Sequence, residues 1–228
     1  MKQILSLTAA GLLTAAAAFA APFAPVGTNT ALPANSFGGS GIPTDNVMTA
    51  TSAGGLLVGL SAHARFVGPL ATDAAGTFFA PTGSTAPALS NNGTWNFNYI
   101  VDATNTASGL LSTYTYRLTV GSDALGTLSF DPVALIPDNS PTGSTSKAGN
   151  SENPGFNFLV FPSGVYDPNI SDVYAVKLEA LDGNGNVIAT SAININVGAS
   201  SVPDAGSTFM MLGLAVAGIA GLRRKLAV

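Results

Sequence analysis

Alternation of apolar and polar side chains with a period of two dominates the middle of this 228-residue chain, and helical spacing is nearly missing there. From Trp95 to Val101, for example, every second residue is aromatic or aliphatic. The other apolar series are Leu56 to Phe66; Tyr114, Tyr116, Leu118 and Val120; Leu128 and Phe130; Phe156, Phe158 and Val160; and Tyr174, Val176, Leu178 and Ala180. A strand with one apolar face must bury it against a second sheet, so the pattern predicts an all-β fold. We expect a single antiparallel β-sandwich of about seven strands, immunoglobulin-like in the loose sense.

A hairpin should close this sandwich. The segment Asp182 to Asn186 reads Asp-Gly-Asn-Gly-Asn, which is typical of a tight turn whose residues adopt positive φ. We expect Gly183 and Gly185 at the positive-φ positions. The return strand, Val187 to Val197, again alternates between an apolar and a more polar face.

The N-terminus has the composition of an export signal. Lys2 is followed by an uncharged stretch rich in Leu and Ala, and Ala18-Phe19-Ala20 fits the small-x-small cleavage pattern. The apolar run is too short and too rich in alanine to favour a permanent membrane span. We therefore predict a signal peptide over residues 1–20, recognised by the export machinery and removed between Ala20 and Ala21.

The C-terminus carries a second, different signal in three parts. The polar segment 202–208 contains Pro203 and Gly206, the stretch Phe209 to Leu222 is uncharged, and three basic residues follow. As a helix, 14 residues reach about 21 Å, which is short for a hydrocarbon core of about 30 Å. Basic residues stay on the cytoplasmic side, so the preceding domain is expected outside.

This tripartite end resembles the PEP-CTERM class of bacterial sorting signals, and most closely its VPDSG-CTERM variant. The residues that carry the resemblance are the motif Val202, Pro203, Asp204, Ala205 and Gly206 and the basic stop Arg223, Arg224 and Lys225. Ala205 stands where the variant usually has serine, and Asp204 replaces the glutamate of the commonest motif. The resemblance implies transient membrane insertion and processing by an exosortase, a membrane-embedded protease, with the product at the cell surface or in the extracellular matrix.

The body carries weaker resemblances. The segment Trp95 to Tyr99 is similar to segments in the bodies of other PEP-CTERM proteins. This resemblance implies no particular activity. The last hairpin resembles the closing strands of bacterial immunoglobulin-like surface modules.

These signals predict the organisation of the chain. A polar stretch between Pro137 and Pro154 is expected to be a long loop, and the N-terminal segment a tether or a loosely added strand. The expected units are a signal peptide (1–20), a flexible N-terminal segment (21–50), the β-sandwich (51–198) and the sorting signal (199–228), with motif 202–208, membrane helix 209–222 and basic tail 223–225.

Composition excludes several classes of function. Only 9% of residues are charged and the formal net charge is −4, so the chain cannot neutralise many phosphates and nucleic-acid binding is not expected. It has no cysteine, which excludes thiolate metal sites, thiol nucleophiles and disulfides. The body must therefore be stabilised by its core alone.

Few residues are candidates for catalysis. His63 is the only histidine and shares a strand face with Ser61 and Arg65, but no Gly-x-Ser-x-Gly elbow accompanies it. We expect a histidine on the strand surface. The only glutamates are Glu152, in the expected polar loop, and Glu179, at an outward strand position. Paired catalytic carboxylates are not predicted from these two.

Candidates for binding are equally sparse. The residues Asp182, Asn184 and Asn186 mimic the opening of a calcium loop, but Val187 and Ile193 stand where such a loop needs glycine and glutamate. A looser calcium site could draw on Asp131, Asp138, Asp167 and Asp172. A sugar-stacking platform could use Trp95, Tyr99, Tyr114 and Tyr116, although three of these are expected to point into the core.

We therefore predict an exported bacterial surface or matrix protein whose monomeric β-sandwich has a structural or adhesive role, with no enzyme activity and no cofactor. Its partners would be the export machinery and an exosortase, and an extracellular polysaccharide is a further candidate. The alternatives are an extracellular carbohydrate- or calcium-binding module, using loops at one end of the sandwich, and an unrecognised hydrolase.

Overall fold

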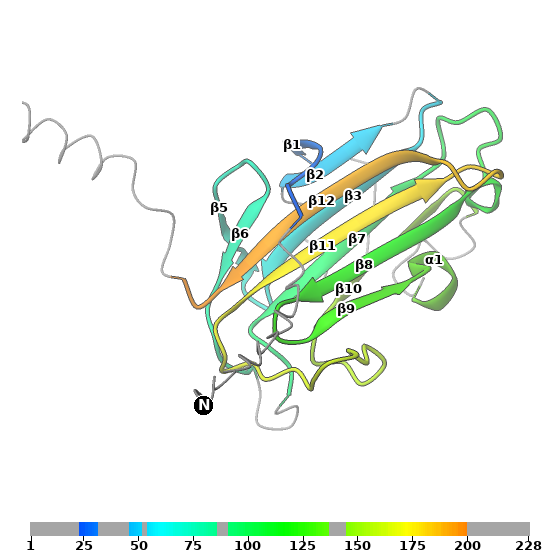
Figure 1. The fold of residues 1–228 in the computed structure, drawn as a ribbon. Helices are drawn as coiled ribbons and strands as arrows, with labels where there is room; N and C mark the ends of the chain where they lie inside the picture. Colours follow the sequence, from blue (N-terminus) through cyan, green and yellow to red (C-terminus); the bar gives the residue numbers. More distant parts are fainter. Residues whose placement is uncertain (1–22, 32–45, 52–53, 86–90, 137–144, 200–228) are drawn as a thin grey trace, which may run out of the picture.

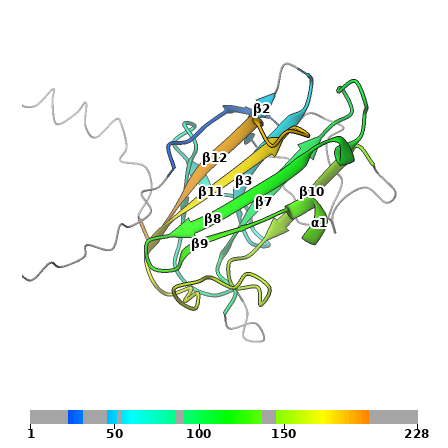
Figure 2. The same cartoon turned by 45° about the vertical axis from the view of Figure 1, so that its right-hand side comes forward.

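The computed structural model describes residues 23–31, 46–51, 54–85, 91–136 and 145–199. The described residues form twelve strands in two sheets, together with one short 3₁₀ turn and one short α-helix. In both views the ladder of strands β12, β11, β8 and β9 lies in front of β3, β7 and β10 (Figures 1 and 2). The predicted mostly-β fold is confirmed, with more strands than expected.

The first sheet has the order β1-β2-β3-β7-β10, with β4 paired to β3. Its strands are β1 (Thr28–Ala31), β2 (Asn46–Thr51), β3 (Leu57–Ala64), β4 (Gly68–Pro69), β7 (Trp95–Asp102) and β10 (Lys147–Glu152). The second sheet has the order β5-β6-β12-β11-β8-β9. Its strands are β5 (Ala71–Thr72), β6 (Thr77–Ala80), β8 (Thr115–Ser122), β9 (Gly126–Phe130), β11 (Asp172–Leu181) and β12 (Val187–Val197). The 3₁₀ turn η1 covers Leu111–Thr113 and helix α1 covers Pro132–Leu135.

One core lies between the two sheets. On β3, β7, β8, β11 and β12 the predicted apolar face lies in this core, except for the exposed Val187 at the start of β12. On β3 and β7 the opposite face is buried as well, including Ser61, His63, Asn96 and Asn98. The largest fully buried side chains are Trp95, Tyr99, Phe97, Leu56, Leu60, Leu118, Leu178, Ile193 and Ile195, together with Ile100 and Glu152. A shared apolar core of this kind is the main source of stability in a chain without disulfides.

The expectation of purely antiparallel pairing is wrong at one position. Strand β6 pairs in parallel with β12, in the register Asn194 to Thr77 through Val197 to Ala80. After β4 the chain passes from the first sheet to the second, where β6 runs in the same direction as β12. An alternation of apolar and polar residues shows which side chains share a face of a strand, but it does not show the direction in which the strand runs.

A second correction concerns the stretch from Pro137 to Pro154, predicted to be a polar loop. Its part Lys147–Glu152 is strand β10, which pairs with β7 at the edge of the first sheet. Its sequence, Lys-Ala-Gly-Asn-Ser-Glu, lacks apolar alternation and so gave no strand signal. Residues 137–144 lie outside the described residues.

The series Phe156, Phe158 and Val160 is not a strand, contrary to the prediction. Residues 153–171 form a loop between β10 and β11 in which Phe158 and Val160 are exposed. Pro154 has no N–H to donate to a ladder, and Gly155 follows it.

Within the segment 21–50, expected to be a tether or an added strand, the described residues form β1 and β2 at the edge of the first sheet. Val26 also bridges to Ala192 on β12. The predicted signal peptide (1–20) and the residues from 200 onward lie outside the described residues. Within the described ranges, no helix has the length and apolar character needed to cross a bilayer.

Candidate functional site

The end of the molecule at which the chain leaves β12 brings several loops together. Val197, the last residue of β12, pairs with Asp172 at the start of β11, and the Gly198 N–H donates to the Ala80 carbonyl at 2.8 Å. Neighbouring loops join this end through the hydrogen bonds from Arg65 N to Thr94 O (2.8 Å) and from Gly83 N to Pro168 O (2.6 Å). We call it the exit end; Figure 1 shows β12 reaching it in orange.

A buried asparagine holds the loop 153–171 in place. Asn153 is fully buried, and its Oδ1 accepts hydrogen bonds from Gly93 N (2.9 Å) and Gly155 N (3.0 Å). Its Nδ2 donates to Gly93 O, Trp95 O and Asn96 Oδ1 at 2.8–3.1 Å. One side chain thus connects the start of the loop to the start of β7.

Close packing completes this part of the loop. A Cβ on Gly155 would collide with the Asn91 carbonyl, and one on Gly93 with the Tyr166 hydroxyl. The Tyr166 ring packs against Tyr174 at 6.0 Å between centroids. Burial raises the pKa of the Tyr166 hydroxyl far above its ordinary value, so the group stays neutral.

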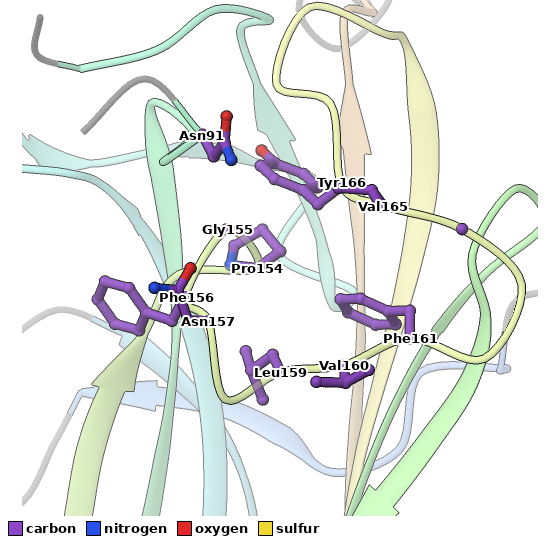
Figure 3. A pocket seen from close by; sticks show the side chains of 11 residues that line it. Asn91, Pro154, Gly155, Phe156, Asn157, Leu159, Val160, Phe161, Val165 and Tyr166 are labelled. Carbon is purple, nitrogen blue, oxygen red and sulfur yellow. The ribbon is translucent and has the colours of Figure 1, made fainter.

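A cleft of about 180 Å³ opens beside this loop (Figure 3). Its lining is Asn91, Pro154, Gly155, Phe156, Asn157, Leu159, Val160, Phe161, Gly164, Val165 and Tyr166. No lining residue is acidic, basic or histidine, so the cleft offers apolar surface and a few neutral hydrogen-bonding groups. It can hold an apolar or weakly polar group, and its side chains supply neither a carboxylate nor an imidazole.

Large apolar side chains are exposed around the same end. Phe66 adopts a left-handed conformation (φ 61°), which is unfavourable for a residue with a Cβ, and turns its ring toward solvent. The Arg65 guanidinium lies 4.8 Å from the Phe66 ring centroid and 5.5 Å from that of Phe156, and Phe156 lies 5.8 Å from Phe158. The exposed fractions are 82% for Phe66, 86% for Val67, 52% for Phe158, 71% for Val160 and 86% for Val165.

We call these five exposed side chains, together with the half-buried Phe156, the exit-end apolar surface; its members are Phe66, Val67, Phe156, Phe158, Val160 and Val165. The alternation in the sequence does not reveal this surface, because it predicts a strand for Phe156, Phe158 and Val160. The signal that could have found it is the pair Phe66-Val67, two large apolar residues in succession at the end of an alternating strand.

His63, expected on the strand surface, is buried (5% exposed) on the outer face of β3, the side of the strand that points away from the core. Its Nδ1 lies 3.0 Å from Asn98 Nδ2, which also donates to Ser61 Oγ at 2.9 Å. Burial and the nearby Arg65 charge lower the pKa of His63 to about 4, although the Asn98 hydrogen bond acts to raise it. A base of such low pKa is weak at neutral pH.

The two glutamates lie in different sheets. Glu152, expected in a polar loop, is on β10 and only 2% exposed. Glu179, on β11, pairs with Arg117 (2.8 Å) and Lys177 (3.1 Å). Burial raises the pKa of Glu179, but the hydrogen bonds and charges of those two cations outweigh burial and bring it below its ordinary value.

The candidate calcium ligands do not gather. Asp182 Oδ1 accepts from Asn184 N and Asn186 N, both at 2.9 Å, which is the bonding of a turn. Asp131 caps helix α1, whereas Asp167 bonds within its own turn at the exit end. Among the described residues no group of three or more His, Asp or Glu side chains is placed to hold a metal ion, and Asp138 lies outside them.

The aromatic candidates separate into two kinds. Trp95, Tyr99 and Tyr116 are buried in the core, as predicted. Tyr114 is half-buried and lines a cleft of about 450 Å³ at the end opposite the exit end. The other residues of this Tyr114 cleft are Leu111, Ser112, Tyr116, Asp131, Val133, Ala134, Thr145, Lys147 and Ala148.

The sorting and cleavage residues predicted from the sequence lie outside the described residues. These are Ala18, Ala20, Ala21, Val202, Pro203, Asp204, Ala205, Gly206, Arg223, Arg224 and Lys225.

Comparison with known families identifies a VPDSG-CTERM motif over residues 201–226. No curated protein and no solved structure matches the chain significantly. The chain therefore carries an exosortase-type sorting signal, which implies an exported, cell-surface-associated protein.

Proposed function

We propose that this protein displays a structural or adhesive β-sandwich at the bacterial cell surface or in the extracellular matrix. In this scheme the signal peptide (1–20) directs export and the helix 209–222 holds the precursor in the membrane. An exosortase then cuts near the segment Val202 to Gly206. The observation that carries the proposal is the VPDSG-CTERM motif over residues 201–226.

The position of the motif relative to the fold supports this order of events. The last described strand, β12, ends at Val197, only a few residues before the motif begins. Cleavage within the motif would remove none of the described strands.

The described part of the body supports a non-catalytic role. Its two glutamates lie in different sheets, its histidine is a weak base, and the exit-end cleft has no charged lining. Two sheets that share one core are compatible with an immunoglobulin-like sandwich, to which we assign the body.

The proposal is tested by following the C-terminus of the native protein. The double variant Pro203→Ala, Asp204→Ala should leave full-length precursor in the membrane, whereas the neighbouring change Ser200→Ala, outside the motif, should be processed normally. Mass spectrometry of the surface-localised protein should show a C-terminus that lacks Arg223 to Lys225. If the mature form kept these residues, processing by an exosortase would be ruled out.

A second candidate function is carbohydrate binding at the Tyr114 cleft. The half-buried Tyr114 ring can stack on a sugar, and Ser112 and Thr145 bring hydroxyl groups to the same lining. The two charged residues of the lining already have partners, because Asp131 caps α1 and Lys147 pairs with Asp102 at 3.0 Å.

On a glycan array, Tyr114→Ala should abolish any binding that uses this cleft. The matched control is Phe158→Ala at the opposite end, which should retain it. Binding that is unchanged in Tyr114→Ala would exclude the cleft as the sugar site.

A further inference from the structure

The exit end is the part of the body from which the chain continues toward the expected membrane segment. Residues 198–208 separate β12 from the expected membrane helix, and eleven residues span at most about 40 Å when fully extended. The eleven residues of β12 themselves extend over about 35 Å toward the opposite hairpin. The exit end is therefore attached within reach of the bilayer, whereas the hairpin Asp182–Asn186 lies at the far end of β12.

The exit end is also where the exposed apolar side chains gather. Phe66 and Val67 come from the turn after β3, and Phe158, Val160 and Val165 come from the loop 153–171, which also holds the half-buried Phe156. Contacts through Arg65 and between the phenylalanine rings join the two segments. The loop is held by the Asn153 hydrogen bonds, so these side chains are presented from a firmly attached support.

The backbone at Phe66 is consistent with a function for its ring. The left-handed conformation opposes stability, and with 82% exposure the ring recovers little by burial. Asparagine would tolerate the same backbone better and would not expose an apolar ring. A ring held in solvent at the exit end is explained if it contacts something apolar there.

From these observations we propose that the exit-end apolar surface docks on the outer leaflet of the bilayer in which the C-terminal segment is anchored. This inference rests on the proposed function, because the anchor brings the surface to the lipid. A short tether raises the local concentration of the surface at the membrane, so that a contact of low intrinsic affinity is sufficient. Docking would hold the cleavage segment, residues 202–206, beside the membrane-embedded protease.

The charges of the body indicate which lipid is expected. Residues 21–201 carry eleven acidic and four basic side chains, a net charge of −7, and Asp167 and Asp172 lie at the exit end. Docking is therefore not driven by attraction to anionic lipid. It is driven by burial of the apolar side chains in the bilayer. We expect docking on vesicles of zwitterionic phosphatidylcholine.

The test uses the full chain, which has no native cysteine, so a single introduced cysteine carries a single label. Phe158→Cys and Val165→Cys report on the exit-end apolar surface, and Asn184→Cys, exposed in the opposite hairpin, is the control. Each is labelled with an environment-sensitive dye and reconstituted in phosphatidylcholine vesicles that contain nitroxide lipid. We expect quenching at positions 158 and 165 to exceed that at position 184 at least about two-fold.

A second variant separates docking from anchoring. Phe66→Asn with Val67→Ser should reduce quenching at position 165 to the level of position 184, while flotation shows the chain still bound to vesicles. Because Phe66 and Val67 are exposed and asparagine suits the left-handed backbone, this variant should keep its circular dichroism spectrum.

The outcomes distinguish the two proposals. A chain that floats with equal quenching at positions 158, 165 and 184 would overturn the docking inference and leave the sorting proposal intact. A chain that does not float would overturn the membrane anchor, and the docking inference with it. Quenching that falls when a soluble polysaccharide is added would assign the surface to a glycan instead of lipid.

Discussion

At the scale of single residues, His63 links the fold to pH. Its imidazole is buried beside Asn98, and its pKa in the folded state is about 4, against about 6.5 when unfolded. Between these values the unfolded chain takes up a proton that the folded chain does not, so stability falls as the pH is lowered through this window.

We predict that lowering the pH from 7 to 4 removes about 2–3 kcal/mol of stability through His63 alone. Urea denaturation of residues 21–201 at several pH values measures this loss, and His63→Asn should show a flatter profile between pH 6.5 and 4. The lowered pKa values of Asp102 and Glu179 act in a lower window, because stability from a depressed carboxyl is lost only as the pH falls below its ordinary pKa. Parallel profiles for the two proteins above pH 4 would show that His63 is not the source.

Gly183 and Gly185, in the turn between β11 and β12, allow the effect of backbone conformation on stability to be tested with two similar substitutions. Gly185 has φ 82°, whereas Gly183, also expected at positive φ, is not among the positive-φ residues. A Cβ at either position meets no atom within 4 Å, so only the backbone distinguishes them. The difference follows from the turn, in which Gly185 N donates to Asp182 O at 2.9 Å.

We therefore expect Gly185→Ala to lower the free energy of unfolding by about 1 kcal/mol, because alanine is strained in the left-handed region. Gly183→Ala, the control, should change it by less than about 0.5 kcal/mol. Thermal denaturation of both variants decides this, and equal effects would contradict it. Loss of a measurable calcium affinity in Gly185→Ala would contradict the assignment of Asp182–Asn186 to a simple turn.

At the scale of elements, the loop 153–171 depends on one side chain. Asn153 accepts from Gly93 and Gly155 and donates toward three acceptors near the start of β7. Alanine at this position would leave buried backbone groups without partners, which is more costly than the loss of the bonds themselves.

We predict that Asn153→Ala destabilises the body by about 2–4 kcal/mol and frees the loop. Hydrogen exchange at the Gly93 and Gly155 amides should accelerate. The control is Asn157→Ala, a change at an exposed residue of the same loop, which should leave both amides protected. Unchanged protection in Asn153→Ala would mean that packing around Tyr166 holds the loop without the asparagine.

At the scale of the whole molecule, every described strand lies between Thr28 and Val197. The expected membrane segments lie outside this range, so we predict that residues 21–201 fold alone as a soluble, monomeric, β-rich domain. Far-ultraviolet circular dichroism and size-exclusion chromatography test this. An insoluble product, or a spectrum dominated by helix, would show that the body needs its terminal segments.

The strands that could be predicted from the sequence are those with an apolar face that packs against apolar side chains of the opposite sheet. For β7, β8, β11 and β12 the period of two indicated both the strand and its inward face. Strand β10 could not be predicted, because an edge strand of polar sequence shows no such period. The strand predicted for Phe156 to Val160 was wrong, because an exposed apolar series can have the same spacing as a buried one. For the exit-end apolar surface the only sequence signal is the pair Phe66-Val67, since composition does not tell whether an aromatic side chain is covered.

The sequence by itself determined the destination of this protein and its class of fold. A sorting signal is read as a linear segment, and the alternation of a strand is a local property of the backbone, so neither depends on distant contacts. Only the tertiary structure decided that His63 is buried, that β6 runs parallel to β12, and that Phe66 lies at the same end as the loop 153–171. Burial, strand order and surface patches are relations between segments far apart in the chain, and these exist only once the two sheets have packed.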